Sequence, residues 1–164
     1  MLALKQDIKY MLYRFLMRLT LSTDYALRLL MLVGLEPDRL VIIEEVADRF
    51  HISKNHLMKV AYQLGKAEYL ETVRGRNGGL RLNKTPDQIA VDVVRTMEPD
   101  FAVVECEDPI GFCKITPACA LRAAMREAVQ AFLTKLDEYT LEHLLRPRSR
   151  LRQLLGVEQK RAVA

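Results

Sequence analysis

The chain has 164 residues, half of them hydrophobic, a formal net charge of +4 and three cysteines. This length suits one hydrophobic core from which one long element extends, and the low glycine, proline and aromatic content indicates a mainly α-helical protein. No uncharged apolar run of about 18 residues occurs, which excludes a membrane span, and the odd number of cysteines excludes complete disulfide pairing. These features together indicate a cytoplasmic protein.

Residues 1–16 do not have the pattern of a signal peptide. Lys5, Asp7 and Lys9 interrupt the apolar sequence, and no small-residue cleavage site follows. Met17 opens a cleaner helix start, so we predict that the native chain begins there and that residues 1–16 are a non-native or flexible extension. A short amphipathic arm is the alternative.

Two helices are predicted in the region that follows. Residues 22–35 begin with Ser22 or Thr23 as a cap and Asp24 in the first turn. Their apolar residues repeat on one helical face: Ala26, Leu29, Leu30 and Val33. After Pro37, residues 44–50 predict a second, short helix.

A third helix is predicted from Lys54 to Lys66, after a tight turn at residues 51–53. Ser53 is placed to cap this helix, and its apolar residues repeat at spacings of three and four: Leu57, Val60, Ala61 and Leu64. Two helices joined by so short a turn form a helix-turn-helix, whose second helix enters the major groove of DNA. The residues on or near its free N-terminal side are candidate DNA contacts: Ser53, Lys54, Asn55, His56 and Lys59.

A basic β-hairpin is predicted next, over residues 69–82. Asn77-Gly78 is a strong turn signal between two short strands, and the hairpin adds further candidate DNA contacts: Arg74, Arg76, Asn77 and Arg81. A helix-turn-helix followed by such a hairpin is a winged helix, and an arginine-bearing wing suits the negative potential of a narrow minor groove. Residues 52–84 hold seven basic residues against two acidic ones, which is the charge that a phosphate-facing surface needs.

The C-terminal half predicts further helices. Thr85-Pro86 begins a fourth helix that ends at Glu98-Pro99, and this helix completes a winged helix-turn-helix domain over residues 17–99. Residues 120–145 carry an apolar stripe that one small domain cannot cover, so we predict a long C-terminal dimerisation helix and a homodimer. A core helix of a monomer is the alternative. Residues 146–164 are predicted to be a flexible basic tail.

The three cysteines, Cys106, Cys113 and Cys119, lie in a predicted loop at residues 100–119. Acidic neighbours of Cys106 disfavour a free thiolate, so a nucleophilic role is not indicated. The paired Cys-x2–4-Cys knuckles typical of structural zinc are missing from the sequence, whereas wider spacing suits an iron–sulfur cluster with a non-cysteine fourth ligand. Spacing alone leaves a cluster, a zinc ion and a thiol-based switch open.

The predicted function is binding and sensing rather than catalysis. No Ser/His/Asp or Cys/His constellation, phosphate-binding loop or paired general acid and base stands out in the sequence, so the chain is not predicted to be an enzyme. A metal site next to a DNA-binding module indicates a sensor that controls transcription.

Several motifs together identify a family that the chain resembles. They are Met17-Arg-Leu-Thr-x-x-Thr-Asp-Tyr-Ala-Leu-Arg28, Lys54-Asn-His-Leu-Met-Lys-Val60, Arg74-Gly-Arg-Asn-Gly-Gly-Leu-Arg-Leu82, Asp92-Val-Val-Arg-x-x-Glu-Pro99, Phe112-Cys-Lys-Ile-Thr-Pro-Ala-Cys119 and Ala131-Phe-Leu-x-x-Leu-Asp-x-Tyr-Thr-Leu141. With them the chain resembles the nitric-oxide-sensing iron–sulfur repressors (NsrR). This is a branch of the winged-helix regulators that also includes the iron–sulfur cluster assembly regulator.

The resemblance implies a homodimer that binds a [2Fe–2S] or [4Fe–4S] cluster through Cys106, Cys113 and Cys119. In the nitric-oxide branch the fourth ligand is an acid on the first helix of the other subunit, and the matching residue here is Asp24. The cluster assembly regulator uses a histidine just beyond the third cysteine, where this chain has Ala-Leu-Arg-Ala. The first gap, of six residues, is one or two residues longer than is usual in the family, so the cluster type stays open.

The resemblance also implies a mechanism on a palindromic double-stranded DNA operator. Two recognition helices about 34 Å apart would enter successive major-groove faces. Nitric oxide would alter the cluster, free the helix that carries Asp24, lower the affinity for the operator and derepress genes for nitric oxide detoxification. A thiol- or zinc-dependent redox regulator on the same winged helix is the alternative function.

Overall fold

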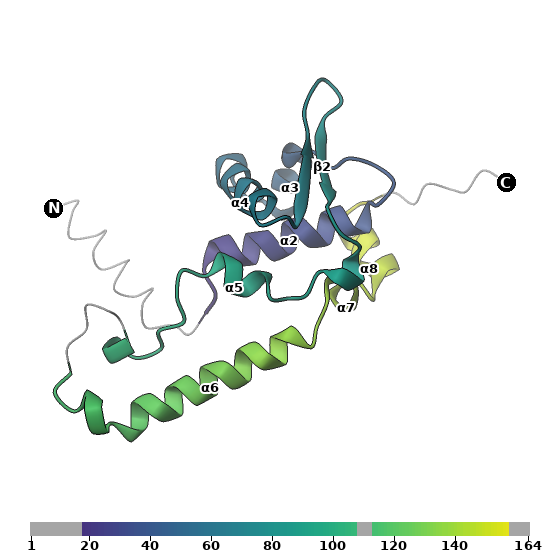
Figure 1. Cartoon of the computed structure of the whole chain (residues 1–164). Coiled ribbons are helices and arrows are strands. Elements are labelled where there is room, and N and C mark those ends of the chain that lie inside the picture. The colour runs from purple at the N-terminus through teal and green to yellow at the C-terminus, as the bar shows by residue number, and fades with distance from the viewer. Residues whose placement is uncertain (1–17, 108–112, 158–164) are drawn as a thin grey trace.

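The computed structural model describes residues 18–107 and 113–157, so the predicted extension at residues 1–16 lies outside the described residues. The fold is mainly α-helical with a small antiparallel hairpin, as the sequence predicts (Figure 1). None of the described helices is long and apolar enough to cross a membrane. The helices are α2 (Leu21–Leu35), α3 (Ile43–Phe50), α4 (Lys54–Lys66), α5 (Val93–Met97), α6 (Ala120–Asp137), α7 (Leu141–Leu144) and α8 (Arg148–Leu154). The strands are β1 (Leu70–Val73) and β2 (Gly79–Leu82), and 3-10 turns lie at Pro86–Gln88, Glu105–Glu107 and Thr116–Ala118.

Helix α2 lies at the centre of the core. All four apolar residues that the sequence places on one face are buried, and Leu32 and Leu35 are buried as well: Ala26, Leu29, Leu30, Leu32, Val33 and Leu35. The N-cap is Thr20, whose Oγ1 accepts a hydrogen bond from the Thr23 N–H at 3.3 Å, so the predicted cap at Ser22 or Thr23 is wrong. Glu98, just after α5, accepts a hydrogen bond from the Thr20 N–H at 2.7 Å, and its negative charge suits the positive end of the α2 dipole.

Helices α3 and α4 form the predicted helix-turn-helix. Helix α4 spans the predicted residues, and α3 begins one residue before its predicted start. The turn between them is tight because His51 adopts the left-handed conformation with φ of 53°, and Ile52 is buried after it. The four apolar residues that repeat along α4 are all buried, as predicted: Leu57, Val60, Ala61 and Leu64. Through these buried residues α4 packs against α2 and α3.

The predicted hairpin is confirmed as β1 and β2. The strands pair with Leu70 opposite Leu82 and Val73 opposite Gly79. The wing loop closes with a hydrogen bond from the Gly78 N–H to the Gly75 carbonyl at 3.0 Å. A Cβ at position 78 would lie 2.3 Å from the Val73 carbonyl oxygen, so only glycine fits this side of the turn.

The predicted fourth helix and the predicted long helix are both interrupted. The first is a 3-10 turn followed by α5, and the second ends as α6 at Asp137 and resumes as α7. The reason is a backbone pairing between the two interruptions: the Leu141 N–H donates to Ile89 O at 2.7 Å, and the Val91 N–H donates to Tyr139 O at 2.9 Å. The prediction of one continuous helix over residues 120–145 is therefore wrong.

Residues 146–157 after α7 are folded, which corrects the prediction of a flexible tail for this described part of residues 146–164. Helix α8 lies beside the C-terminal end of α2 (Figure 1), where Arg152 donates a hydrogen bond to the Leu35 carbonyl. Arg152 also lies 3.6 Å from a carboxylate oxygen of Glu36, which is buried. Val157 is buried as well. A guanidinium at this place satisfies a terminal carbonyl and suits the negative end of the helix dipole.

We expect Arg152→Ala to lower the free energy of unfolding by about 1–3 kcal/mol, because it leaves the Leu35 carbonyl without this donor and leaves Arg39, at 2.7 Å, as the remaining cation beside the buried Glu36. Arg150→Ala is the matched control, since Arg150 is exposed and bonds to Gln153 at 2.7 Å on the same helix; its effect should stay within about 0.5 kcal/mol. Urea unfolding at one fixed protein concentration measures both variants. Equal stability of the two variants would show that this contact of α8 does not stabilise the fold.

Candidate nucleic-acid interface and metal-binding loop

The exposed face of α4 carries most of the predicted DNA contacts on the helix-turn-helix. Ser53, Lys54, Asn55 and Lys59 are all exposed. Lys54 forms an ion pair with Glu44 of α3, and the hydrogen bond from Lys54 lowers the pKa of the Glu44 carboxyl. No ion pair engages Lys59 among the described residues, so its ammonium group is available to a phosphate.

His56 is oriented differently from its neighbours on α4. Its Nε2 lies 3.2 Å from the Ser22 hydroxyl oxygen, and its ring meets the ring of Tyr25 edge-on with centroids 4.8 Å apart. Both partners lie on α2, so the half-buried imidazole fastens the start of the recognition helix to the central helix. Its predicted role as a DNA contact stays a prediction, and the structure adds this contact between helices.

The wing presents Arg74, Arg76 and Asn77 as exposed side chains at its tip, and the hairpin projects away from the helices (Figure 1). Within the part of the chain that the structure describes, neither of these two arginines forms an ion pair. Arg81 on β2 is different, because its guanidinium donates to both carboxylate oxygens of Glu71 at 2.8 and 3.0 Å. These hydrogen bonds lower the pKa of Glu71 and raise the pKa of Arg81.

The predicted metal ligands Cys106, Cys113 and Cys119 are free, half-buried thiols. Cys106 lies in the 3-10 turn Glu105–Glu107, and Cys119 is the N-cap of α6. Glu107 beside the first cysteine pairs with Arg126 of α6 at 2.9 Å. In residues 18–107 and 113–157 no three His, Cys, Asp or Glu side chains are brought together in an arrangement that could hold a metal ion. The structure thus places the thiols in one loop but does not converge them.

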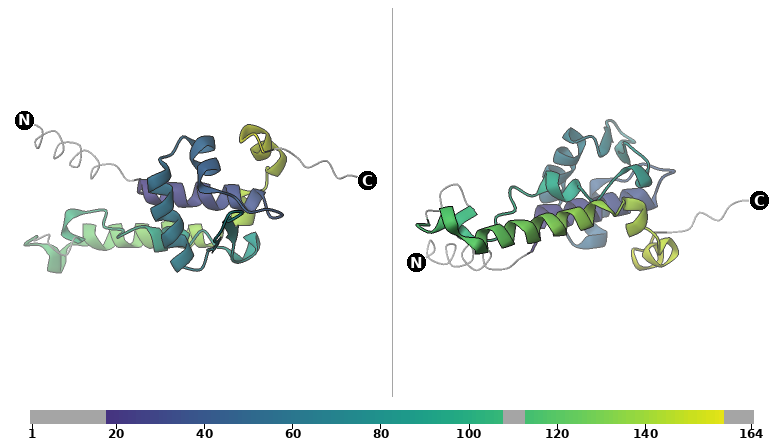
Figure 2. Two further views of the ribbon diagram at one scale, coloured as in Figure 1. Left: turned by 90° about the horizontal axis from the view of Figure 1, so that it is seen from above. Right: turned by 60° about the horizontal axis from the view of Figure 1, so that its bottom comes forward.

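Asp24, the predicted fourth ligand, lies in the first turn of α2. Its carboxylate pairs with Arg28 one turn later at 2.8 Å, and its side chain remains 40% exposed. Asp24 comes from the winged helix, whereas Cys119 is the N-cap of α6 and the described ends of the cysteine loop lie near that N-terminus (Figures 1 and 2). Among the described residues, Asp24 and the cysteines of one subunit are not arranged to bind the same metal ion.

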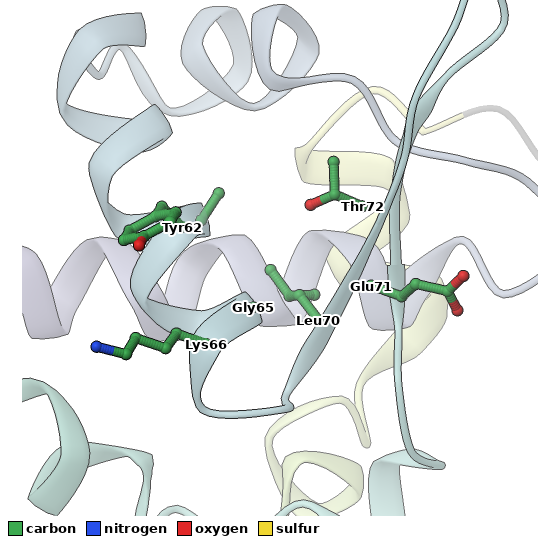
Figure 3. A pocket seen from close by; sticks show the side chains of 7 residues that line it. Tyr62, Gly65, Lys66, Leu70, Glu71 and Thr72 are labelled. Atoms are coloured by element: carbon green, nitrogen blue, oxygen red, sulfur yellow. The ribbon is translucent and has the colours of Figure 1, made fainter.

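Two large hydrophobic side chains exposed on α4 were not among the candidates predicted from the sequence. Met58 is 49% exposed and Tyr62 is 74% exposed. Tyr62 borders a shallow hollow of about 450 Å³ between α4 and β1, together with Lys66, Leu70 and Thr72 (Figure 3). The sequence indicated that Met58 and Tyr62 would be exposed, because both positions fall outside the buried repeat of α4 at residues 57, 60, 61 and 64.

The fold and the exposed basic surface define a winged-helix DNA-binding protein. The chain also matches the model of the Rrf2 family, described as iron-dependent transcriptional regulators, over residues 19–147. A match over most of the chain shows that the protein belongs to this family, and the predicted resemblance is confirmed. Its members are transcriptional regulators rather than enzymes, as the sequence predicts.

Relatives of known sequence agree with this assignment. The chain is 49% identical over 142 residues to the HTH-type transcriptional regulator NsrR of Geobacillus kaustophilus, which covers 85% of this chain and 97% of the relative. It is 45% identical over 143 residues to NsrR of Bacillus licheniformis, covering 85% of this chain and 100% of the relative. It is 44% identical over 146 residues to NsrR of Bacillus subtilis, covering 87% of this chain and 100% of the relative.

Solved structures share the fold at low sequence identity. T. potens IscR superposes with a TM-score of 0.65 at 20% identity, covering 83% of this chain and 91% of that chain. CymR (YrzC), the global cysteine regulator of B. subtilis, superposes with a TM-score of 0.60 at 23% identity, covering 79% of this chain and 96% of that chain. These likenesses confirm the predicted winged-helix architecture.

We expect Arg76→Ala to weaken DNA binding and to reduce the slope of log K against log salt by about 1, since it removes one cation that can neutralise a phosphate. Arg76 is suited to this role because it is exposed on the wing tip without an ion pair among the described residues. Arg150→Ala on α8 removes the same charge away from the wing and should leave the slope unchanged. Fluorescence anisotropy with a DNA duplex over a range of salt concentrations measures both slopes. Equal slopes for wild type and Arg76→Ala would exclude this role of Arg76.

Proposed function

We propose that the protein is a cytoplasmic, homodimeric repressor that binds operator DNA and releases it in response to nitric oxide. The observation that carries the proposal is the set of three free thiols in one loop, joined to a winged helix. The relatives at 44–49% identity are regulators named NsrR, and the family is described as iron-dependent. Both descriptions support an iron–sulfur cluster in this loop.

The residues present suit such a cluster by their chemistry. Cys106, Cys113 and Cys119 supply three soft thiolate ligands, and Asp24 of the partner subunit would supply the fourth. Asp24 is suited to this role because it is partly exposed and is held by one ion pair, with Arg28. When bound, the cluster would supply iron that reacts with nitric oxide.

A second protomer is needed to cover α6. Of the residues of α6, all of which the structure describes, only Leu133 is buried. Large apolar side chains along it are exposed, with Leu121 58% and Phe132 47% exposed. Helix α6 extends from the core as an arm (Figures 1 and 2), so pairing of two such arms would bury this surface. Two-fold pairing implies a palindromic operator.

Helix α2 links the proposed ligand to both helices of the helix-turn-helix. Arg28, the ion-pair partner of Asp24, places its guanidinium carbon 5.8 Å from the centroid of the Phe50 ring at the end of α3. On the other side, Ser22 and Tyr25 contact His56 at the start of α4. A change in what Asp24 binds would therefore act through direct contacts on the position of the recognition helix.

A thiol- or zinc-dependent redox regulator is the second candidate, because free cysteine thiols are the groups that a thiol-based switch uses and are also ligands of zinc. Anaerobic purification distinguishes the two. A coloured protein with stoichiometric iron and sulfide supports the cluster, whereas a colourless protein with stoichiometric zinc supports the alternative.

We expect Cys113→Ala to abolish the cluster absorbance and the response of operator binding to nitric oxide, because one of three thiolate ligands is removed. Thr116→Ala in the same loop is the control and should keep both properties. Electrophoretic mobility shifts with and without nitric oxide measure the response. If Cys113→Ala still bound the operator tightly and was still released by the gas, the cluster mechanism would be wrong.

We expect Ser22→Ala to keep the cluster and to bind the operator, but with a smaller ratio of affinities before and after nitric oxide. Allosteric coupling typically amounts to about 5- to 150-fold, and removal of the hydrogen bond between Ser22 and His56 should reduce it several-fold. Ser149→Ala on α8 is the control. Operator titrations by anisotropy in both states give the ratios. An unchanged ratio in Ser22→Ala would show that the contact with His56 does not transmit the signal.

A further inference from the structure

The exposed face of α4 combines apolar and basic side chains. Met58 is 49% exposed and Tyr62 is 74% exposed. Because residues three and four apart are neighbours on a helix, Asn55, Met58 and Tyr62 form one row. The other exposed side chains around this row are polar or basic: Lys54, Lys59, Gln63 and Lys66.

A single exposed apolar side chain is common and needs no partner. Met58 differs because of the charge around it. Lys54 and Lys59 flank it on the helix, and the wing adds Arg74 and Arg76 on the same domain. Such a surface favours a polyanion, and double-stranded DNA is the polyanion whose major groove admits an α-helix.

Tyr62 and Lys66 mark the rim of this face. One turn apart on α4, they project to the same side of the helix and border the hollow that Thr72 of β1 lines from across it (Figure 3). A hydroxyl and an ammonium group on one side suit the phosphate backbone. Met58 has neither a charge nor a hydrogen-bond donor, so it does not suit phosphate and needs an apolar partner.

The major groove offers one apolar group, the C5 methyl of thymine. Met58 is the fifth residue of α4, in the N-terminal part of a recognition helix that reaches base edges. Its unbranched and flexible thioether side chain adapts to the position of a methyl group.

We propose that Met58 is a specificity-determining residue that contacts the C5 methyl of a thymine in each half-site of the operator. This inference rests on the proposed use of α4 as the recognition helix. Met58 thus reads sequence, whereas Lys59 and the wing arginines position the protein on the backbone.

The test uses an operator selected in vitro from random DNA with the full-length, anaerobically purified protein. Each thymine is then replaced by 2′-deoxyuridine, which lacks the C5 methyl and keeps the base-pairing groups. For wild type, we expect one position per half-site at which this replacement weakens binding about four-fold, and about 15-fold when both half-sites are changed. Met58→Ala should bind the thymine operator more weakly and show no response to the methyl at that position.

Two further variants keep the test decisive. Met58→Leu retains an apolar side chain and should retain a response to the methyl, and Leu154→Ala removes a 67% exposed apolar side chain from α8 and should behave as wild type. All proteins are compared at matched iron content and with circular dichroism as a check of folding. Equal responses of wild type and Met58→Ala to deoxyuridine would overturn the role of Met58 and leave DNA binding intact. Failure to select any DNA would overturn both the role of Met58 and the use of α4.

Discussion

The burial of α2 on several sides is the constraint on which the rest of the structure depends. Helices α3, α4, α5 and α7 and strand β2 all contact it, and Leu29, Leu32 and Leu35 along it are almost completely buried. Because protein interiors are close-packed, a displacement of this helix cannot be absorbed by empty space around it. Its neighbours must move with it, and one of them is the helix proposed to read DNA.

Contacts at both ends of α2 add to this constraint. Thr20 and Glu98 fix its N-terminus, while Arg152 of α8 and the buried Glu36 meet at its C-terminus. Asp24 stands near the first of these ends, next to the residues that contact His56. A ligand at that position would act where α2 is tied both to the start of the recognition helix and to the end of α5. Asp24 and the cysteines of one subunit do not form a metal site among the described residues, so in the proposed mechanism the signal enters from the cysteines of the partner subunit.

Most of the DNA-binding domain could be predicted from the sequence because its signals are local. The apolar repeat of α4 and the Asn77-Gly78 turn each concern residues a few positions apart, and both elements are confirmed within a residue or two. The interruption near Tyr139 could not be predicted in this way. It depends on backbone hydrogen bonds to residues 89–91, some 50 positions earlier in the chain.

The sequence by itself determined the chemistry of this protein: three thiols in one loop, a basic helix-turn-helix with its wing, and motifs that place the chain in its family. Only the tertiary structure decided how these groups are used. It turned His56 toward Ser22 and Tyr25, paired Arg81 with Glu71 while leaving Arg76 exposed, and docked α8 against α2 through Arg152. The physical reason is that side-chain periodicity is a property of neighbouring residues, whereas ion pairs and packing between distant segments exist only once the chain has folded.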